Sequence, residues 1–117
     1  MTDKSALPLS GVRVLDFSRV LAGPWCAMVL GDLGAEVIKV EHPERGDDTR
    51  DWGMRIGATE TAYFNSVNRN KRSVCLDLKT PEGQTIARDL IRKSDIVIQN
   101  FKFGDIERLG LGYDALE

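Results

Sequence analysis

The sequence lacks the features that would link it to a membrane, a secretory route or a nucleic acid. Its longest uninterrupted apolar run covers residues 25–30, far short of the about 20 residues that a membrane-spanning helix needs. Residues 1–11 contain no apolar stretch of the kind found in signal peptides. The net charge is −2, whereas a nucleic-acid-binding domain is normally clearly basic. We therefore expect a cytoplasmic protein with neither a membrane nor a nucleic-acid partner.

Cysteine and histidine are scarce, which limits the catalytic and metal sites that the chain can build. The two cysteines, Cys26 and Cys75, lie in apolar segments without the close spacing of a zinc or redox pair. We expect both to be buried, reduced thiols. His42 is the only histidine and has no identifiable partner. The sequence therefore predicts no metal site, and it contains no recognisable pair of nucleophile and base.

The sequence does contain an alternation of strand-like and helix-like segments. Four β-branched runs, at residues 12–17, 36–42, 72–78 and 95–101, predict strands. A first helix is expected to be capped by Gly23, to end at Gly34 and to bury one stripe, formed by Cys26, Val29, Leu30 and Leu33. A second helix is expected to begin with Thr80 as N-cap and Pro81 at its first position. Its predicted core face consists of Ile86, Ala87, Leu90 and Ile91.

Strands that alternate with amphipathic helices are typical of parallel βαβ units. We expect an α/β fold with a Rossmann-like parallel sheet in the order 3-2-1-4, flanked by helices. Such a sheet needs cover on both faces, and two clear helices cover four strands poorly. Residues 1–117 are therefore expected to form a single partial domain, the N-terminal part of a larger one. Residues 47–68 are predicted to be a long connecting loop with a short helix within residues 61–67.

Cations near the predicted strand ends favour a ligand that carries phosphate. Ligands of open parallel sheets bind beyond the carboxyl ends of the strands, where the strand order reverses. Lys79 follows the third strand and Arg108 follows the fourth, although each residue taken alone fits an ordinary solvated surface. A nicotinamide cofactor is disfavoured. Glu41 stands where a ribose-binding acid would, but residues 18–24 contain one glycine where the dinucleotide fingerprint needs three.

Four stretches taken together resemble the N-terminal portion of the family III CoA-transferases. This family includes formyl-CoA transferase and carnitine CoA-transferase and is related to the α-methylacyl-CoA racemases. The stretches are LSGVRVLDFSRVLAGPWCAMVLGDLGAEVIKVE, RGDDTR, YFNSVNRNKRSVCLDLKTPEG and IVIQNFKFGDIERLGLGY. The resemblance extends from Leu9 to the end of the chain.

The resemblance implies an acyl-CoA:carboxylate CoA-transferase with no permanently bound cofactor. Coenzyme A would pass from an acyl-CoA to a carboxylic acid, with a dicarboxylate as one option, through mixed anhydrides and an aspartyl-CoA thioester. The family also implies an interlocked homodimer. Its nucleophilic aspartate would lie beyond Glu117, so no catalytic residue is expected within the chain, and the chain alone is predicted to be inactive.

Carried over position by position, the resemblance implies that eight residues contact CoA: Val20, Leu21, His42, Leu76, Lys79, Asn100, Phe101 and Arg108. Residues 70–73, NKRS, would join Lys79 in the CoA cradle. Leu21 stands where formyl-CoA transferase has a glutamine beside the reacting carbonyl, and His42 stands where that enzyme has an arginine near the nucleotide. Both differences disfavour oxalate as the acceptor.

Two other functions stay open from the sequence. An α-methylacyl-CoA racemase would share the CoA-binding half, but racemases tend to have a much shorter connection than residues 47–70 provide here. The alternative from another class is a fragment that acts as a non-catalytic association module, because an incompletely covered sheet exposes apolar surface that drives association. Measured exchange of CoA between an acyl-CoA and a free acid distinguishes these functions.

Overall fold

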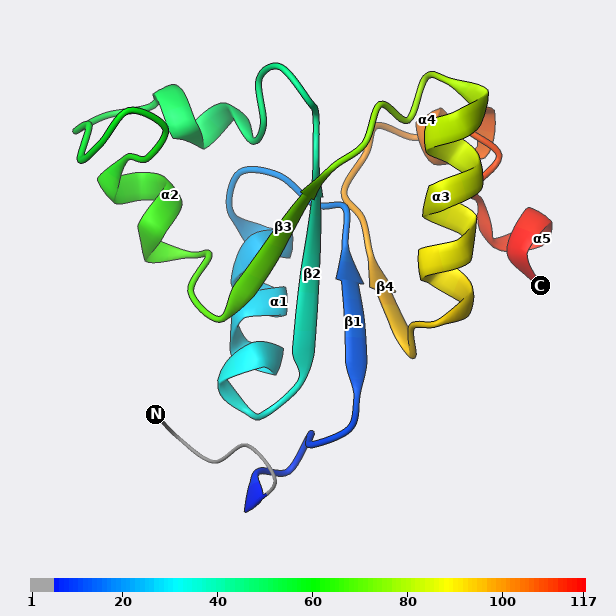
Figure 1. Cartoon of the computed structure of the whole chain (residues 1–117), viewed down its shortest axis with the longest axis horizontal. Helices are drawn as coiled ribbons and strands as arrows, with labels where there is room; N and C mark the ends of the chain where they lie inside the picture. The colour runs from blue at the N-terminus through cyan, green and yellow to red at the C-terminus, as the bar shows by residue number, and fades with distance from the viewer. Residues whose placement is uncertain (1–5) are drawn as a thin grey trace.

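The sheet has the predicted order and direction. The structure, a computed structural model, describes residues 6–117. Its four parallel strands lie in the order β3-β2-β1-β4 (Figure 1). Each strand is shorter than the sequence predicts: β1 (Arg13–Asp16), β2 (Glu36–Glu41), β3 (Lys71–Cys75) and β4 (Ile96–Ile98).

Helices connect the strands and follow the last of them. They are α1 (Ala22–Asp32), the 3₁₀ helix η2 (Asp48–Asp51), α2 (Ala62–Ser66), α3 (Pro81–Arg92), α4 (Asp105–Arg108) and α5 (Tyr113–Leu116). The short helix α2 confirms the prediction within the long connection between β2 and β3, and Figure 1 shows that this connection forms a lobe beside the sheet. Across residues 6–117, no helix has the length and apolar character needed to cross a bilayer.

The core has one layer on each face of the sheet, because successive side chains of a strand point to opposite faces. On one face, α1 packs through Ala27 against Val14 and Val37. On the other, α3 packs through Ala87 against Leu15 and Val40. The right-handed βαβ crossovers that the alternation predicts place these two helices on opposite faces.

The buried face of α1 differs from the prediction. The helix starts ahead of Pro24, and its buried residues are Pro24, Ala27, Met28 and Gly31. Val29 and Leu33 were predicted to be in the core but are 40% and 42% exposed. The reason is the close approach of helix and sheet, because a Cβ atom built on Gly31 would lie 3.3 Å from a Val37 methyl carbon. Ala27 and Gly31 therefore pack where the helix approaches the sheet most closely, and Val29 and Leu33 face outward.

The prediction that both cysteines are buried is wrong. Cys26 belongs to the outer face of α1, and Cys75 ends β3 at an edge of the sheet; both are exposed free thiols. Edge position explains Cys75, because no strand of the described chain lies beyond β3. An apolar sequence neighbourhood was therefore a poor guide to burial at the margin of this fold.

Helix α3 begins as predicted, with Thr80 accepting a hydrogen bond from the Gly83 N–H and Pro81 in the first turn. Ala87 is fully buried, and Leu90 and Ile91 pack against the core. Ile86 was predicted to join them but is 47% exposed. Since α3 lies at one side of the sheet (Figure 1), only part of its apolar stripe meets another layer.

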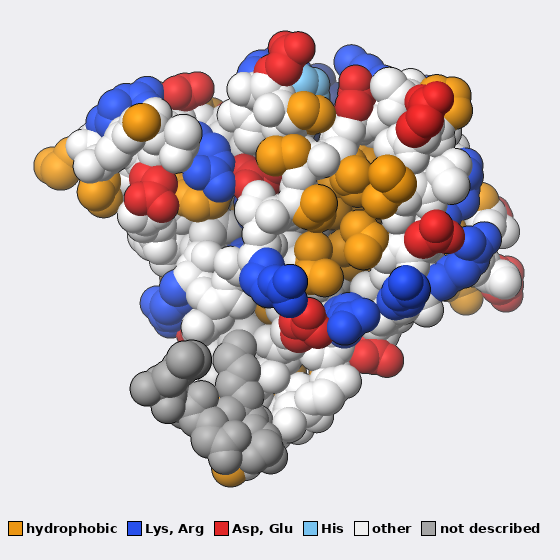
Figure 2. All heavy atoms as spheres, viewed as in Figure 1, with side chains coloured by type: hydrophobic (Ala, Val, Ile, Leu, Met, Phe, Trp, Pro, Cys, Tyr) orange, Lys and Arg blue, Asp and Glu red, His pale blue; other side chains and the backbone are white. Residues whose placement is uncertain are grey.

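Part of the sheet face beside α3 is left uncovered. Figure 2 shows an apolar area between β3 and α3, with a row of Lys and Arg side chains below it. Ile38, Val74 and Leu78 are only partly buried and belong to the hydrophobic cluster on this face. The sheet thus has less cover on this face than a parallel sheet normally receives.

Candidate functional site

A cavity of about 430 Å³ opens beyond the carboxyl ends of the strands. It is lined by the loops that follow β1, β2, β3 and β4, which is where open parallel sheets bind their ligands. Its wall combines apolar side chains with cations. The cations that line it are Arg19, Lys39, Arg45, Lys79 and Arg108.

Five of the eight residues that the resemblance assigns to CoA line this cavity: His42, Leu76, Lys79, Phe101 and Arg108. They come from three different connections, so the fold brings together residues that are far apart in the sequence. Val20, Leu21 and Asn100 are not among the lining residues. Asn100 instead binds the main chain of Arg19, which does line the cavity.

Two tilted aromatic rings and a guanidinium form one side of the cavity. The ring centroids of Phe17 and Phe101 are 6.4 Å apart, and the Arg19 guanidinium carbon lies 5.5 Å from the Phe101 centroid. The sequence prediction missed Arg19. Its position directly after the first strand, at the point where the strand order reverses, was the available signal.

The loop after β3 is shaped to present Lys79. The Asp77 carboxylate accepts a hydrogen bond from the Lys79 N–H at 3.0 Å, and the Asp77 carbonyl accepts one from the Thr80 hydroxyl at 2.8 Å. Such side-chain bonds to nearby backbone favour a turn over a continued strand. The chain therefore turns immediately after β3, with the exposed Lys79 on the cavity wall.

His42 has a fixed arrangement of its ring nitrogens. Nδ1 accepts hydrogen bonds from the N–H groups of Glu44 and Arg45, at 3.1 and 3.4 Å. In the neutral ring the proton therefore resides on Nε2. His42 can thus offer one hydrogen-bond donor to a ligand, while its Nδ1 keeps the loop with Arg45 against the cavity.

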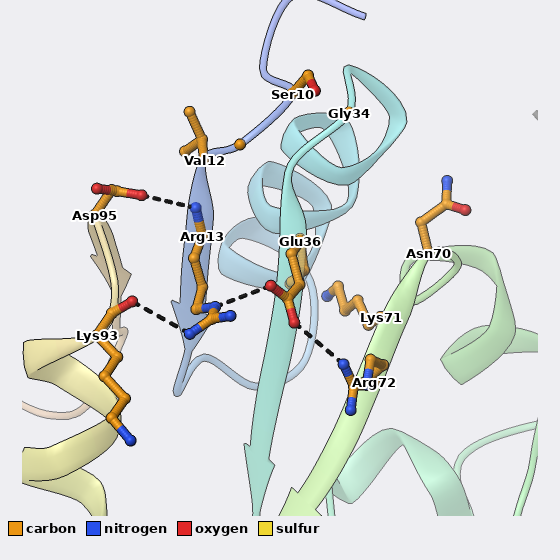
Figure 3. Close-up of a pocket in the computed structure, with 12 residues that line it drawn as sticks. Ser10, Val12, Arg13, Gly34, Glu36, Asn70, Lys71, Arg72, Lys93 and Asp95 are labelled. Atoms are coloured by element: carbon orange, nitrogen blue, oxygen red, sulfur yellow. Dashed lines mark hydrogen bonds and ion pairs between the residues drawn. The ribbon is translucent and has the colours of Figure 1, made fainter. Parts of the chain in front are cut away.

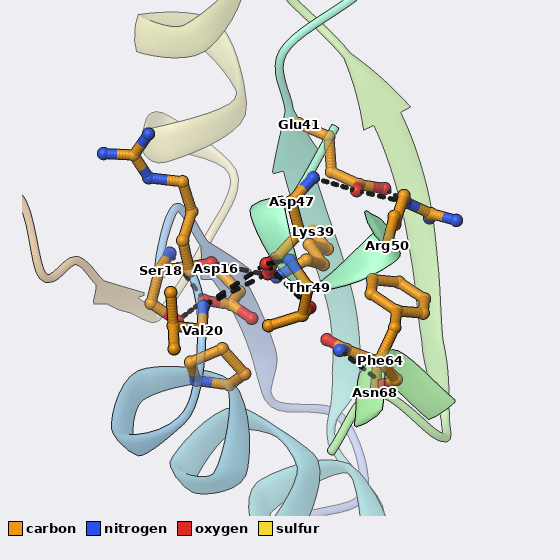
Figure 4. A network of polar contacts seen from close by, with 12 residues as sticks. Asp16, Ser18, Val20, Lys39, Glu41, Asp47, Thr49, Arg50, Phe64 and Asn68 are labelled. Carbon is orange, nitrogen blue, oxygen red and sulfur yellow. Dashed lines mark hydrogen bonds and ion pairs between the residues drawn. The ribbon is translucent and has the colours of Figure 1, made fainter. Parts of the chain in front are cut away.

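Charged side chains are buried on the face of the sheet that α1 covers (Figure 4). Lys39 Nζ contacts an Asp47 carboxylate oxygen at 3.0 Å, and both side chains are at most 1% exposed. Lys39 also donates to the Ser18 carbonyl at 2.9 Å. The Asp47 carboxylate accepts further bonds from the N–H and hydroxyl of Thr49. Burial raises the pKa of Asp47, but these bonds and the Lys39 charge outweigh it and lower that pKa overall.

A second buried pair involves Lys71, the first cation of the predicted NKRS cradle. Lys71 Nζ lies 3.0 Å from an Asp16 carboxylate oxygen, and it donates to the Pro24 carbonyl and the Asn68 side chain at 2.9 and 2.8 Å. Burial lowers the pKa of Lys71. Its ammonium group is thus fully engaged within the fold, joining β3 to β1 and to the start of α1.

The remaining cation of that segment, Arg72, lies in a hollow at the amino ends of the strands (Figure 3). Arg72 and Arg13 both bind the Glu36 carboxylate, at 3.1 and 2.9 Å. This hollow of about 640 Å³ is larger than the carboxyl-end cavity. Its arginines are already paired, however, and parallel sheets bind ligands at the opposite edge. The structure therefore does not bring residues 70–73 together with Lys79.

Glu41 ends β2 in a tight set of hydrogen bonds. Arg50 binds both of its carboxylate oxygens at 2.8 Å, and Ser73 and the Asp47 N–H donate as well. Burial raises the pKa of Glu41, but the bonds from Arg50, Ser73 and Asp47 outweigh it and lower the pKa from 4.5 to about 2. This position holds a structural ion pair with Arg50.

The Glu41 carboxylate is expected to make the fold sensitive to acid. Its pKa is lower in the folded than in the unfolded chain, so the unfolded chain binds protons first and stability falls as the pH drops from 4.5 towards 2. The difference corresponds to about 3 kcal/mol. Glu41→Gln should reduce this loss across the same pH range, measured by chemical unfolding, because glutamine does not titrate. Glu44→Gln, at an exposed neighbouring position, should leave it unchanged; equal behaviour of both variants would contradict the assignment.

The site is equipped to bind an anion, and its buried carboxylates are committed to cations. Asp16, Glu41 and Asp47 each have a Lys or Arg partner within 3.0 Å. Among residues 6–117, no group of His, Cys, Asp and Glu is arranged to hold a metal ion. The rest of the cavity wall combines apolar side chains with Arg19, Arg45 and Lys79, and with Arg108 beside Asp105. The cations outnumber the carboxylates there, which suits a ligand with phosphate groups and an extended organic part.

Comparison with known proteins gives a single family. The model of CoA-transferase family III matches residues 9–117. The chain is 50% identical over 115 residues to succinate–glutarate CoA-transferase of Agrobacterium fabrum, an alignment that covers 93% of this chain and 29% of that protein. It is 50% identical over 110 residues to human succinyl-CoA:glutarate CoA-transferase, covering 94% of this chain and 25% of that protein. The chain thus spans less than a third of the length of these relatives.

A solved structure shares the fold described above. A CaiB/BaiF family protein from Brucella suis superposes with a TM-score of 0.87 at 48% sequence identity. The superposition covers 94% of this chain and 30% of that one.

Proposed function

Because the chain belongs to CoA-transferase family III, we propose that it is the CoA-binding N-terminal part of an acyl-CoA:carboxylate CoA-transferase. The observation that carries this proposal is the carboxyl-end cavity, where His42, Lys79 and Arg108 meet from three separate connections. The substrates are an acyl-CoA and a carboxylic acid, and no resident cofactor takes part. The names of the relatives support dicarboxylic acids such as succinate and glutarate as the acids exchanged.

The cavity is suited to the CoA ester through charge and shape together. Lys79 and Arg108 are exposed at its margin and carry the charges that bind phosphate oxygens. Phe17, Phe101 and Leu76 supply apolar surface between them. The Arg108 guanidinium is held by Asp105 in the first turn of α4, which restricts its orientation before a ligand binds.

The chemical step requires a nucleophile that this part of the chain does not supply. Glu41 and Asp47, two carboxylates that line the cavity, are buried in ion pairs. We assign the step to an aspartate in polypeptide C-terminal to this chain. Its carboxylate attacks the acyl carbonyl of the acyl-CoA, which gives a mixed anhydride and releases the CoA thiolate; the thiolate then attacks the aspartyl carbonyl, which gives the aspartyl-CoA thioester and releases the carboxylate of the donor. The residues described here bind and orient the CoA moiety, and the chain on its own is inactive.

A second copy of the polypeptide belongs to the proposal. Trp25, Val29 and Leu33 follow one another at helical spacing on α1 and are 55%, 40% and 42% exposed. An apolar stripe of this kind, with the uncovered area beside α3, supports association with further polypeptide. A homodimer, located in the cytoplasm, completes the proposal.

The proposal is tested by CoA exchange in the full-length polypeptide that carries this chain. With succinyl-CoA and glutarate, glutaryl-CoA should form and be detected by chromatography. Lys79→Ala and Arg108→Ala should each raise KM for the CoA ester about tenfold, since a hydrogen bond to a charged group contributes about 1.5–3 kcal/mol, and should lower kcat less. Both side chains touch the CoA moiety in every state of the reaction, so their loss weakens binding more than turnover.

Arg72→Ala is the matched control, because Arg72 is an exposed cation at the opposite end of the strands. It should leave KM unchanged. Absence of CoA exchange in the full-length polypeptide would contradict the transferase, and epimerisation of a 2-methylacyl-CoA in its place would favour the racemase. If Arg72→Ala raises KM for the CoA ester as much as Lys79→Ala and Arg108→Ala do, the carboxyl-end cavity is not the specific binding site, and the hollow at the amino ends of the strands becomes the candidate.

A further inference from the structure

Val20 has a backbone conformation that its side chain disfavours. Its φ is +77°, in the left-handed region that L-residues with a branched Cβ rarely adopt. Among the described residues other than glycine, Asn70 also has a positive φ, of +63°, but asparagine tolerates this region well. Val20 is therefore a real outlier, and it lies in the loop between β1 and α1 at the edge of the cavity.

Side chains from elsewhere in the fold hold this loop at three successive residues. Lys39 donates to the Ser18 carbonyl at 2.9 Å. Asn100 binds both main-chain groups of Arg19, accepting from its N–H at 3.0 Å and donating to its carbonyl at 2.7 Å. The Val20 N–H donates to the Asp47 carboxylate, with its two oxygens at 3.3 and 3.4 Å.

The anchor of Val20 is itself fixed by burial and charge. Figure 4 shows the Val20 main chain and the Lys39 side chain meeting the Asp47 carboxylate. That carboxylate is fully buried, pairs with Lys39 at 3.0 Å and accepts two bonds from Thr49. The same lysine thus holds the loop directly at Ser18 and indirectly through Asp47 at Val20. An arrangement so strongly constrained explains how the unfavourable φ persists.

The loop of residues 18–21 places Arg19 at the cavity, which requires a fixed backbone shape. The side chain of Arg19 extends over the Phe101 ring and lines the cavity. Rotation of the backbone at Val20 would turn both Arg19 and the N–H groups that precede α1 away from their present positions. Strained backbone that the surroundings enforce is found preferentially at functional sites, where it fixes a binding geometry in advance.

We infer that Asp47 and Asn100 are positioning residues that hold residues 18–21 in a strained shape needed for binding and orienting the CoA ester. The inference rests on the proposed function, since it concerns the same cavity. It assigns a task to Asp47, which the resemblance left without one. It also gives Asn100 a role through Arg19 rather than through contact with the ligand.

Two substitutions of Val20 separate backbone strain from the loss of the side chain. Val20→Gly removes the strain but also frees the loop, because glycine populates both signs of φ. Val20→Asn removes the same branched side chain but favours the left-handed conformation. In the full-length transferase, Val20→Gly should leave the melting temperature unchanged or raise it, yet lower kcat/KM for the CoA ester about tenfold, a loss of preorganised geometry. Val20→Asn, which loses the same side chain but keeps the left-handed backbone, should retain a clearly higher kcat/KM than Val20→Gly.

Asp47→Asn, compared with the exposed neighbour Asp48→Asn, tests the anchor. The first should lower kcat/KM and the second should not. Where Asp47→Asn fails to fold, the Val20 pair still decides the question.

Equal kcat/KM values for Val20→Gly and Val20→Asn would overturn the inference, because the fixed backbone at position 20 would then contribute nothing to the reaction. A lower melting temperature of Val20→Gly would also overturn it, because the φ of Val20 would then carry no strain that glycine relieves. A wild-type protein that exchanges no CoA would instead overturn the proposed function, and the inference with it. An active wild type with an unaffected Val20→Gly variant would overturn the inference alone.

Discussion

Replacing Lys71 by methionine is expected to destabilise the fold by about 3–5 kcal/mol, the typical cost of removing one partner of a buried ion pair. Asp16 is fully buried, and its carboxylate would lose the ammonium group at 3.0 Å. Methionine fills a similar volume, so the loss reflects charge and hydrogen bonds rather than a cavity. The Pro24 carbonyl and the Asn68 side chain would lose a donor at the same time. Chemical unfolding of the variant and the wild type measures the effect.

Arg72→Met is the matched control for this prediction. Arg72 follows Lys71 in the sequence, but its side chain is 79% exposed and its ion pair with Glu36 lies at the surface. Exposed pairs contribute about 0–1 kcal/mol. Adding Asp16→Asn to Lys71→Met should recover part of the loss, because it removes the stranded charge. If Lys71→Met and Arg72→Met lower the free energy of unfolding equally, the Lys71–Asp16 pair contributes no more to stability than the surface pair of Arg72, and the prediction is wrong.

The features that the sequence predicted well are those with strong local signals. Thr80 and Pro81 mark the start of α3 by chemistry that acts within a few residues, and the structure reproduces that start. The order 3-2-1-4 followed from alternation and the handedness of βαβ crossovers, which leave few arrangements open. Strand lengths were overestimated, because the predicted runs continue to residues such as Leu78 and Phe101, which lie past the paired register of β3 and β4.

The features that the sequence predicted poorly depend on what packs against them. Val29 and Leu33 have the spacing of a core stripe, yet α1 meets the sheet closely at Gly31, where a Cβ atom would be tightly packed, and the helix buries Ala27 and Met28 instead. Helical spacing identifies an apolar face but cannot say which of two apolar faces meets the core. The exposure of Cys26 follows from the same choice of face.

The candidate site was predicted in position but incompletely in composition. Its place at the carboxyl ends followed from topology, and its assigned residues followed from resemblance. Lys39 and Asp47 were missed because an aspartate within a polar loop gives no local sign of burial and a lysine within a strand gives only a weak one. Their pairing depends on two connections that meet only in the folded chain. The available signal was the position of Lys39 between apolar residues in β2. Because side chains alternate between the two faces of a sheet, Lys39 must share the buried face of Val37.

Gly83→Ala should be among the most damaging substitutions in the chain, although Gly→Ala within a helix normally stabilises by about 0.5–1 kcal/mol. A Cβ atom at Gly83 would lie 1.9 Å from the Asp77 carbonyl oxygen and 2.7 Å from its carbon. Backbone cannot rotate away as a flexible side chain does, so the loop after β3 would have to move. We expect a loss of about 3 kcal/mol, the upper part of the range for overpacking.

The same movement would carry a functional cost, because that loop presents Lys79 and Leu76 to the cavity. KM for the CoA ester should therefore rise along with the fall in melting temperature. Gly57→Ala is the matched control: no atom lies within 4 Å of a Cβ atom built there, and changes at such surface positions stay within about 0.5 kcal/mol. A stable Gly83→Ala protein with normal KM would show that the loop accommodates the methyl group, and the tight turn after β3 would then have no part in holding Lys79 in place.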